Sequence, residues 1–459
     1  MSIAAERAAL LEACLGWMRP HFDAAAALLR HPPPERGRAG IPGHVVRESL
    51  WYATGLLATG AETPTAIRIV DTVLDLQFDE PGAAWDGTWP RAPQDPHPRM
   101  GAVMWRDYDP NWRQFIGCLL GVLARDFAQP LGPARCERVR VAIARALRGE
   151  GDERIVATYS NIALMQAWLA VEFGDAAASA RGVALARAVD AAYRRDGGFA
   201  EFNSPTYYGV DLWGLALWRR AHDRTLVELG AALEADLWRD IAQFHHGGLR
   251  NLCGPYDRAY GMDMTRYAAL LGLWLWWACG DAGRAFPNVT APFGHALDVC
   301  AAPLLAVATP TLPDAVVPRL LDPAPVRSIA RRVGSRSVTA AMTADWMLGA
   351  VDRAAFDPTG QARPATAHWR DPTGGVGWLS IRGELAGTVT DATIEVRADA
   401  PLSIGWRAGA DDAFDSRRWT LGGRRIAVAG CAVSDVAVRA EHGSAVLTLP
   451  RGIARIRFD

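Results

Sequence analysis

The stretch Ala308-Thr-Pro-Thr-Leu-Pro-Asp-Ala-Val-Val-Pro-Arg-Leu-Leu-Asp-Pro-Ala-Pro325 separates two parts of the chain that follow different patterns. Its five prolines lack backbone donors and clash with a preceding helical turn, so no helix can run through the whole stretch. Apolar residues recur with a helical period before it and alternate, as in strands, after it. We therefore expect two domains, residues 1–308 and 326–459, joined by a proline-rich linker at 309–325.

The part before the linker consists of helical segments with mostly short connections. The expected helices are Ala4–Trp17, His44–Thr59, Thr65–Phe78, one that opens at Asp109, Pro133–Arg148, Thr158–Phe173, Ala178–Arg194, Thr206–His222, Thr225–Phe244, Asp263–Cys279 and Pro292–Val307. No strand-like alternation lies between them. Strongly apolar helices in antiparallel pairs are typical of a solenoid or a closed toroid, and the lack of a fixed repeat favours the toroid.

The part after the linker contains short alternating segments that predict strands. They are Gly377–Ile381, Asp391–Val396, Arg425–Val428, Ala445–Leu449 and Ala454–Phe458, with turn signals such as Pro372-Thr-Gly-Gly375 and Gly422-Gly423. The expected fold class is therefore α+β multidomain, with an N-terminal (α/α) toroid of helical hairpins followed by an antiparallel β-sandwich.

The charge and composition exclude several functions. A formal net charge of −1 gives no general field for nucleic acid or a membrane surface, so we expect neither as a partner. The sequence contains no lysine, which excludes a Schiff-base lysine and a P-loop lysine.

Three features favour a cytoplasmic location. Glu6 and Glu12 lie where a signal peptide would have to be apolar. No stretch is long and apolar enough to span a bilayer. The seven cysteines are scattered, odd in number and without a CxxC pair, which favours reduced buried thiols over disulfides.

Polar chemistry gathers in Arg195-Asp-Gly-Gly-Phe-Ala-Glu-Phe-Asn-Ser-Pro-Thr-Tyr-Tyr-Gly-Val-Asp-Leu-Trp213. Asp196-Gly197-Gly198 indicates a tight turn, and Ser204-Pro205 indicates an N-cap and first helical position. The first turn of that helix then holds Tyr207 and Tyr208, beside Glu201 and Asn203 in the loop. Phenols, a carboxylate and an amide at a helix start predict a binding or catalytic site.

Two further stretches share this character. Asn161 lies near the start of an otherwise apolar helix, where it either caps that helix or binds a ligand. The loop Phe244–Asp263 is rich in glycine and in polar side chains, which favours a functional loop over a surface pair of Asp257 and Arg258 with stacked tyrosines.

The segment 79–109 is too long for an ordinary connection and predicts a loop that covers one end of the helical domain. Trp89 and His97 are its candidate cleft contacts, the alternative being that its aromatic residues pack the loop onto the body. His245, His246 and Asp257 lie close in sequence, but no metal-binding motif contains them, so a divalent metal is unsupported and we predict no cofactor.

The pattern Asp196-Gly-x-x-x-Glu201-x-x-Ser204-Pro-x-Tyr207 resembles the corresponding segment of heparinase II/III-type polysaccharide lyases. Asp109-Pro-Asn-Trp112 and Gly254–Asp263 are similar to uncharacterised bacterial and fungal heparinase-like proteins. The resemblance implies a helical toroid followed by a β-sandwich, with Tyr207 as the catalytic acid. It also implies that Asn161, about one helical hairpin earlier, binds the uronate carboxylate.

The chain departs from this family in its β domain. The lyases carry a His-x-His-x-Asp type segment there, whereas this β domain holds only His368 and His442. No motif supports His368 as a substitute. A catalytic histidine could come instead from His245 or His246.

These observations predict a lyase that cleaves a uronate-containing glycan by β-elimination. Asn161, with Arg258 or Arg250, would neutralise the carboxylate, and His246 is a candidate catalytic histidine. Tyr207 would serve as acid and as a possible base, because a helix N-terminus and a nearby arginine favour the phenolate. The expected substrate contacts are Glu201, Asn203, Tyr208, Trp89, His97, Arg250, Tyr256, Asp257 and Tyr260.

Two alternatives stay open. One is a glycoside hydrolase of toroid fold that uses Glu201 with Asp257 or Asp263 as its two carboxylates. The other is a non-catalytic carbohydrate-binding protein. In each case the expected partner is a carbohydrate, and for the lyase an acidic oligosaccharide.

Overall fold

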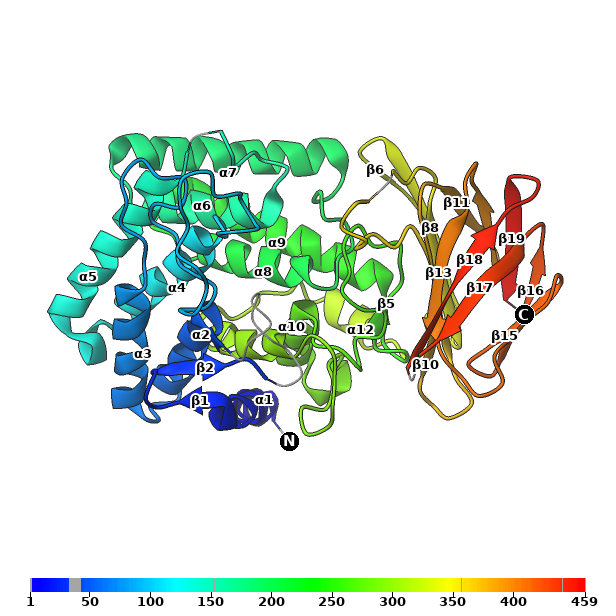
Figure 1. Cartoon of the computed structure of the whole chain (residues 1–459), viewed down its shortest axis with the longest axis horizontal. Helices are drawn as coiled ribbons and strands as arrows, with labels where there is room; N and C mark the ends of the chain where they lie inside the picture. The colour runs from blue at the N-terminus through cyan, green and yellow to red at the C-terminus, as the bar shows by residue number, and fades with distance from the viewer. Residues whose placement is uncertain (1, 33–42, 152, 356, 440, 459) are drawn as a thin grey trace.

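The structure is a computed structural model that describes residues 2–32, 43–151, 153–355, 357–439 and 441–458. A helical domain is followed by a β domain at one end of the long axis of the molecule (Figure 1). The α-helices are α1 Ile3–Met18, α2 Val46–Ala58, α3 Thr63–Asp75, α4 Trp112–Asp126, α5 Ala128–Gly149, α6 Ser160–Phe173, α7 Ala176–Asp196, α8 Tyr207–Trp218, α9 Arg224–Phe244, α10 Leu270–Cys279, α11 Ala302–Val307 and α12 Val316–Leu320. The fold class predicted from the sequence is confirmed.

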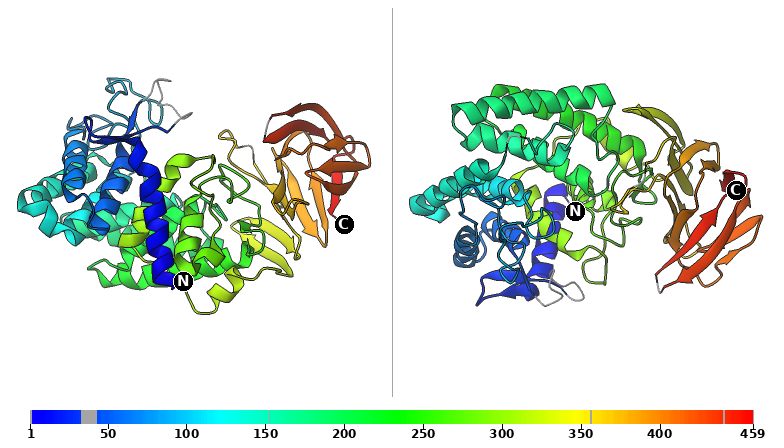
Figure 2. Two further views of the ribbon diagram at one scale, coloured as in Figure 1. Left: turned by 90° about the horizontal axis from the view of Figure 1, so that it is seen from below. Right: turned by 45° about the horizontal axis from the view of Figure 1, so that its top comes forward.

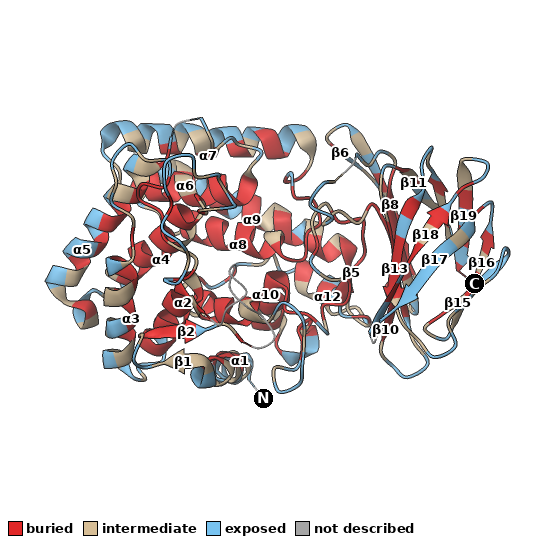
Figure 3. Cartoon of the chain, in the orientation of Figure 1, coloured by how far each residue is buried: buried red, intermediate tan, exposed pale blue. Residues whose placement is uncertain are grey.

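Six of these helices form an inner ring. Helices α2, α4, α6, α8 and α10 pack against one another in that order, and α11 contacts both α10 and α2, which closes the ring. Their sequences are apolar on nearly all sides, as in Leu-Leu-Gly-Leu-Trp-Leu-Trp-Trp of α10, and they are buried almost throughout (Figure 3). The outer helices α3, α5, α7 and α9 bury one face only, which explains their amphipathic pattern.

The loop that introduces α8 follows the expected chemistry with one difference. Gly197 ends α7 in the left-handed region, at φ 70°, where glycine has no steric penalty. Ser204 Oγ accepts a hydrogen bond of 3.0 Å from the backbone N–H of Tyr207. However, α8 begins at Tyr207 and not at Pro205, so Tyr207 is the first residue of the helix.

The prediction that no strands interrupt the helices is wrong. Short strands β1 Phe22–Asp23, β2 Leu28–Arg30 and β3 His44–Val45 form one small sheet, and β4 His245–His246 pairs with β5 Asn251–Leu252. Strands of two or three residues are too short to show alternation. The expected linker likewise contains the five-residue helix α12. The last expected helices are also shorter, because α10 starts at Leu270 and a 3₁₀ segment, η3 Ala296–Ala301, precedes α11.

The β domain is a sandwich of two antiparallel sheets. Its strands are β6 Arg327–Val333, β7 Arg336–Met342, β8 Trp346–Val351, β9 Ala365–Arg370, β10 Val376–Arg382, β11 Ala386–Thr390, β12 Thr393–Arg397, β13 Leu402–Arg407, β14 Ala413–Phe414, β15 Arg418–Leu421, β16 Arg424–Ala429, β17 Ala432–Val438, β18 His442–Thr448 and β19 Ile453–Phe458. One sheet has the order β17-β18-β13-β10-β9-β8-β7-β6, and the other has the order β11-β12-β19-β16-β15-β14. Side chains of both sheets, among them Trp369, Trp406 and Trp419, form the core between them.

The larger sheet also packs on the helical domain with its other face (Figure 2). Ile329, Val338 and Met347 of this sheet belong to the same hydrophobic cluster as the helices. Strand β9 is therefore buried on both faces and shows no alternation, which hides it from sequence analysis.

The loop Phe244–Asp263 forms much of the joint between the two domains. A Cβ atom on Gly248 would lie 2.0 Å from the carbonyl oxygen of Pro323, and one on Gly254 would lie 2.2 Å from Thr366 Oγ1. The backbones of Tyr256 and Arg363 exchange hydrogen bonds of 3.0 and 2.8 Å. The glycines of this loop thus allow its backbone to approach the linker and β9.

Candidate active site

A cavity of about 860 Å³ lies where the inner helices begin. Each of α2, α4, α6, α8 and α10 contributes a residue of its first two turns, and a loop of the β domain closes one side. The lining residues are Arg47, Trp51, Arg91, Trp105, Asp109, Asn111, Trp112, Phe115, Tyr159, Asn161, Ile162, Thr206, Tyr207, Val210, Arg258, Tyr260, Leu270, His295, Asp298, Asp357, Thr359 and Gln361. The exposed N–H groups of helix starts make such a place favourable for an anion.

Tyr207 stands among several polar groups in this cavity. Its phenolic oxygen lies 2.8 Å from that of Tyr260, and the Arg258 guanidinium lies over its ring, 4.0 Å from the centroid. Gln361 of the β domain accepts a 2.8 Å hydrogen bond from Arg258 Nε. The imidazole of His295 stacks on Tyr260, with centroids 4.2 Å apart. An acid, a cation and an imidazole thus share one face of the cavity.

The protonation state of Tyr207 differs from the one expected. Burial and the neighbouring Tyr260 hydroxyl raise the pKa of Tyr207 above its ordinary value, and Arg258 offsets this only in part. The expected phenolate is therefore contradicted. Tyr207 is a protonated phenol, which suits a proton donor.

Asn161 faces the cavity from the first turn of α6. It is buried, and no side-chain bond caps this helix, so the capping alternative does not hold. Its Oδ1 has no hydrogen-bond partner among the described residues. A buried amide oxygen without a partner is costly, so the arrangement suits a ligand that forms a hydrogen bond with this side chain.

His295 is a cavity residue that sequence analysis missed. It precedes η3 in a left-handed conformation, at φ 55°, and its Nδ1 lies 3.1 Å from Asp298 Oδ2. The segment Pro292–Val307 was expected to be one helix, which placed this histidine on a helix surface. The signal that could have indicated the site is the carboxylate of Asp298 three residues after a histidine that follows glycine.

Glu201 lies behind the cavity wall. It accepts a 2.5 Å hydrogen bond from Ser160 Oγ, and its Oε1 lies 3.8 Å from Arg258 Nη1. Burial raises the pKa of Glu201, as it does that of the nearby Asp211 on α8. Neither side chain lines the cavity, so Glu201 supports Arg258 and does not face a ligand.

The structure does not bring His246 to the cavity. Its Nε2 donates to the carbonyl oxygen of Thr343 at 2.8 Å, and its Nδ1 accepts from the backbone N–H of Leu249 at 3.1 Å. Both ring nitrogens thus hold the joint between the domains. His245 and His368 are buried there too, bonded to the carbonyl oxygens of Leu320 and Met262.

Other expected contacts, from the loop before α8 and the loop after α9, also have structural roles. Asp257 pairs with Arg336 of β7 through two bonds of 2.7 and 2.6 Å. Asn203 donates to the carbonyl oxygens of Cys253 and Pro255. None of the following lines the cavity: Asn203, Tyr208, Arg250, Tyr256, Asp257 and Asp263.

The long loop 79–109 reaches the cavity with other residues than those expected. Trp89 is fully buried in the core and donates to the carbonyl oxygen of Val73. His97 lies 2.9 Å from Glu80 outside the cavity. The loop contributes instead Arg91, Trp105 and Asp109.

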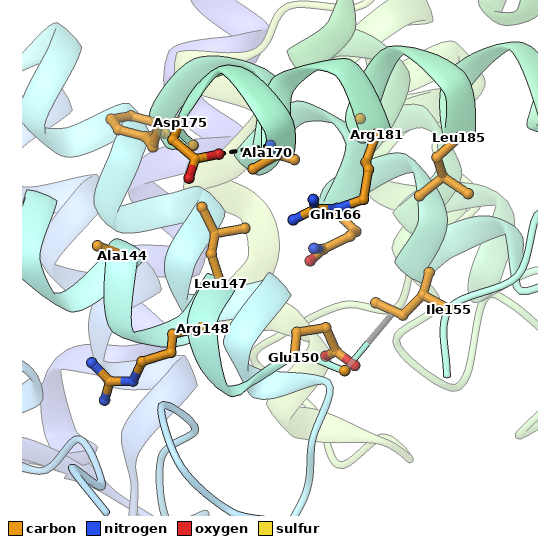
Figure 4. A pocket seen from close by; sticks show the side chains of 15 residues that line it. Ala144, Leu147, Arg148, Glu150, Ile155, Gln166, Ala170, Asp175, Arg181 and Leu185 are labelled. Carbon is orange, nitrogen blue, oxygen red and sulfur yellow. Dashed lines mark hydrogen bonds between the residues drawn. The ribbon is translucent and has the colours of Figure 1, made fainter. Parts of the chain in front are cut away.

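A second cavity, of about 480 Å³, lies on the outside of the ring between α5, α6 and α7 (Figure 4). Gln166, Arg181 and Leu147 are among its lining residues. No residue predicted for the site lies there. Among the described residues no group of three or more His, Cys, Asp and Glu side chains is placed to hold a metal ion, and the seven cysteines form no disulfide. No described helix has the length and apolar character needed to cross a membrane.

Comparison with solved structures finds chondroitin AC lyase of Streptomyces coelicolor A3 in complex with chondroitin sulphate, at 11% identity and a TM-score of 0.48. A tyrosine-to-alanine mutant of the same enzyme matches at 13% identity and a TM-score of 0.43. Each match covers 99% of this chain and 79% of the other. Similarity at this level does not transfer an activity to this chain.

No curated protein matches the chain. A family model described as "Domain of unknown function (DUF8769)" matches residues 8–310. This range covers nearly all of the helical domain and every cavity residue except Asp357, Thr359 and Gln361. The chain therefore belongs to the DUF8769 family.

Proposed function

We propose that the protein is a lyase that cleaves a uronate-containing oligosaccharide by β-elimination. The observation that carries this proposal is the meeting of Tyr207, Asn161, Arg258 and His295 in one cavity. The likeness of the Asp196–Tyr207 segment to heparinase II/III-type lyases agrees with it.

The first requirement of β-elimination is that the uronate carboxylate be neutralised, so that the proton on the adjacent carbon becomes acidic. Arg258 supplies a cation, and Asn161 supplies an amide whose Nδ2 can donate to the carboxylate. The starts of α6 and α8 favour negative charge at the same place. These contacts strengthen as charge moves onto the carboxylate oxygens in the transition state.

The second requirement is a base. His295 lines the cavity, and Asp298 Oδ2, 3.1 Å from its Nδ1, stabilises the imidazolium that forms. His295 takes the proton from the carbon next to the carboxylate. The electrons of that C–H bond form the new C=C bond, and the bond to the leaving oxygen breaks.

The third requirement is an acid for the leaving oxygen. Tyr207 is a protonated phenol and gives its proton to that oxygen. Tyr260, 2.8 Å away and 37% exposed, can return a proton from solvent to Tyr207. The phenol pair therefore accounts for both release and recovery of the proton.

The position of the carboxylates argues against a hydrolase that uses Glu201. Glu201, Asp257 and Asp263 all lie outside the cavity, and Asp257 is held by Arg336. A hydrolase of this type needs two carboxyl groups on either side of one glycosidic bond.

The test is to incubate the protein with oligosaccharides of hyaluronan, unsulfated chondroitin, heparosan and alginate and to follow the near-ultraviolet absorbance of the unsaturated product. We expect product from at least one of them, and a Tyr207→Phe variant should lower kcat by about 10²- to 10⁴-fold with the fold intact. Tyr193→Phe, which removes a hydroxyl bonded to Asp240 outside the cavity, is the matched control and should keep activity. Binding without product, or full activity of Tyr207→Phe, would contradict the proposal.

A further inference from the structure

The charged residues that line the cavity nearly balance one another. Three guanidinium groups, of Arg47, Arg91 and Arg258, share it with the carboxylates of Asp109, Asp298 and Asp357. Such a balance differs from a cavity built for a highly charged chain, in which cations prevail.

Arg47 is occupied by carboxylates. Its Nε lies 2.9 Å from Oε1 of Glu48, which is itself buried, and its guanidinium lies over the ring of Trp51. Burial lowers the pKa of Arg47, but Glu48, Asp298 and Asp109 outweigh burial and raise it overall. Its positive charge is therefore neutralised by carboxylates of the protein itself.

Arg91 is occupied in a similar way. Its Nη2 donates to Asp109 Oδ2 at 3.0 Å and to the carbonyl oxygen of Trp105 at 3.2 Å. Asp109 also accepts a hydrogen bond from the backbone N–H of Asn111, which fixes the carboxylate at the cavity wall.

Arg258 is the exception among the described cations of the cavity. Its hydrogen-bond partner is the neutral amide of Gln361, and Oε1 of Glu201 lies 3.8 Å from its Nη1, beyond hydrogen-bond distance. Burial raises the pKa of that carboxyl group, which weakens its competition for Arg258. One cation is thus available for one anionic group of a ligand.

Three carboxylates line the same cavity as Arg258. Asp298 lies beside His295 and Asp109 beside Arg91, while Asp357 accepts hydrogen bonds from Thr359 and Ala362. Partial burial raises the pKa of Asp357, but these hydrogen bonds lower it overall, so the group is ionised. A second anionic group on the ligand would face the ionised Asp357, since the charges of Asp109 and Asp298 are compensated by Arg91 and by His295 and Arg47.

We propose that the substrate presents a single carboxylate to the cavity and carries no sulfate on the sugars around it. The substrate class is an unsulfated glycan in which the uronate alternates with uncharged sugars. This inference rests on the proposed function, because it assumes that Arg258 binds the uronate that reacts. Because Arg47 and Arg91 are already paired with carboxylates, a sulfate would find no further unpaired guanidinium among the described cavity residues. It would also be repelled by the ionised Asp357, and such repulsion is a common means of rejecting wrong partners.

The test compares each unsulfated oligosaccharide that the protein cleaves with its O-sulfated counterpart of equal length. We expect kcat/KM to be at least about tenfold lower for the sulfated form. Alginate, in which every sugar is a uronate, should also be cleaved less efficiently than an alternating glycan. Equal or better cleavage of the sulfated form, or of alginate, would overturn this inference and leave the lyase activity standing. If no oligosaccharide gives unsaturated product, the proposed function fails instead.

A variant tests the cause of the selectivity. Asp109→Asn keeps the size of the side chain and removes the charge that occupies Arg91, so the preference for the unsulfated form should shrink by about three- to tenfold. Asp107→Asn removes the same charge from the same loop outside the cavity and is the matched control. Thermal melting of both variants confirms folding. An unchanged preference in folded Asp109→Asn would contradict the role of the carboxylates.

Discussion

The guanidinium group of Arg258 makes two different kinds of contact at once. Its flat guanidinium covers the ring of Tyr207, and its Nε is held by Gln361. A planar group can stack and bind a carboxylate in its own plane at the same time, whereas an ammonium group cannot. The residue is therefore expected to be sensitive even to a change that keeps its charge.

Arg258→Lys should lower kcat/KM by about 10- to 100-fold, because lysine loses the stacking and the paired donors. Steady-state kinetics on the best substrate provide the measurement. Arg250→Lys is the control, since Arg250 is an exposed arginine of the same loop outside the cavity. An equal loss in both variants would show that Arg258 acts through the fold of the loop.

Asp211 is a buried carboxyl group whose oxygens have no hydrogen-bond partner among the described residues. Burial, together with the nearby Glu201, raises the pKa of Asp211 well above its ordinary value. The folded state thus favours the protonated form, and this contribution to stability is complete below the unfolded pKa of about 3.9. It is lost as the pH rises toward the folded pKa.

Asp211→Asn cannot ionise and should escape this loss. We expect the variant to gain stability over the parent progressively as the pH rises above about 4, because only the parent has to ionise a buried carboxyl group. Urea unfolding across this pH range measures the difference. A difference that stays constant with pH would mean that Asp211 does not titrate as described.

At the scale of elements, the glycines of the loop Phe244–Asp263 were correctly identified as a sign of close backbone approach, but most of them serve packing between the domains and not ligand binding. Its glycines do bring the backbone close to something, but that partner is the linker and β9. Only Arg258 and Tyr260 of this loop reach the cavity. The sequence shows that a backbone must approach another group closely, and it does not show which group.

Gly248→Ala should destabilise the protein by about 1–3 kcal/mol, because its Cβ would lie 2.0 Å from a backbone oxygen that cannot move aside easily. Gly16→Ala is the matched control. No atom lies within 4 Å of a Cβ at that position of α1, and alanine favours the helix, so stability should hold or rise. Denaturant unfolding compares the two, and a loss at Gly16 equal to that at Gly248 would contradict the close-contact argument.

The helices were predictable where the apolar pattern repeats over a long segment. Ala4–Trp17 and Thr225–Phe244 lie within one residue of α1 and α9, because apolar faces and a capping Asp223 mark them clearly. The start of α10 was missed because Asp263 turns the chain by accepting from Thr265 instead of capping a helix.

At the scale of the molecule, acid should loosen the joint between ring and sandwich. Burial lowers the pKa of His368 from 6.5 to about 4 and that of His245 from 6.5 to about 3. Because both folded values are below the unfolded one, the unfolded state binds more protons between them. The stability is complete above about pH 6.5 and falls as the pH decreases to about 4.

For His368 alone the loss over this range should be roughly 3 kcal/mol. His368→Asn should flatten the pH dependence between pH 6.5 and 4.5 relative to the parent, because the variant lacks the imidazole that becomes protonated on unfolding. Urea unfolding at several pH values measures it, with exposed His222→Asn as the control. A slope in His368→Asn as steep as in the parent would contradict the assignment.

The candidate site was predictable in part. One cavity is lined by Tyr207, Asn161, Arg258 and Tyr260, which come from separate segments of the chain. The inner helices α2, α4, α6, α8 and α10 begin at the same end of the ring, so polar residues at their first turns meet there. His295 was out of reach, since its place depends on how a loop turns just before η3. Trp89 was predicted as a cleft contact, but it is buried in the core and packs the loop 79–109 onto the helical domain.

The bond between Gln361 and Arg258 joins two domains through the atoms of the site itself. The family match ends at residue 310, so the amide that accepts the hydrogen bond of Arg258 lies outside the part of the chain that the family model matches. A relative with a different sequence between β8 and β9 could keep every residue of the ring and yet aim that cation elsewhere. Within such a family, changes of substrate preference would then come from sequence changes in the β-sandwich, while the residues of the helical ring stay the same.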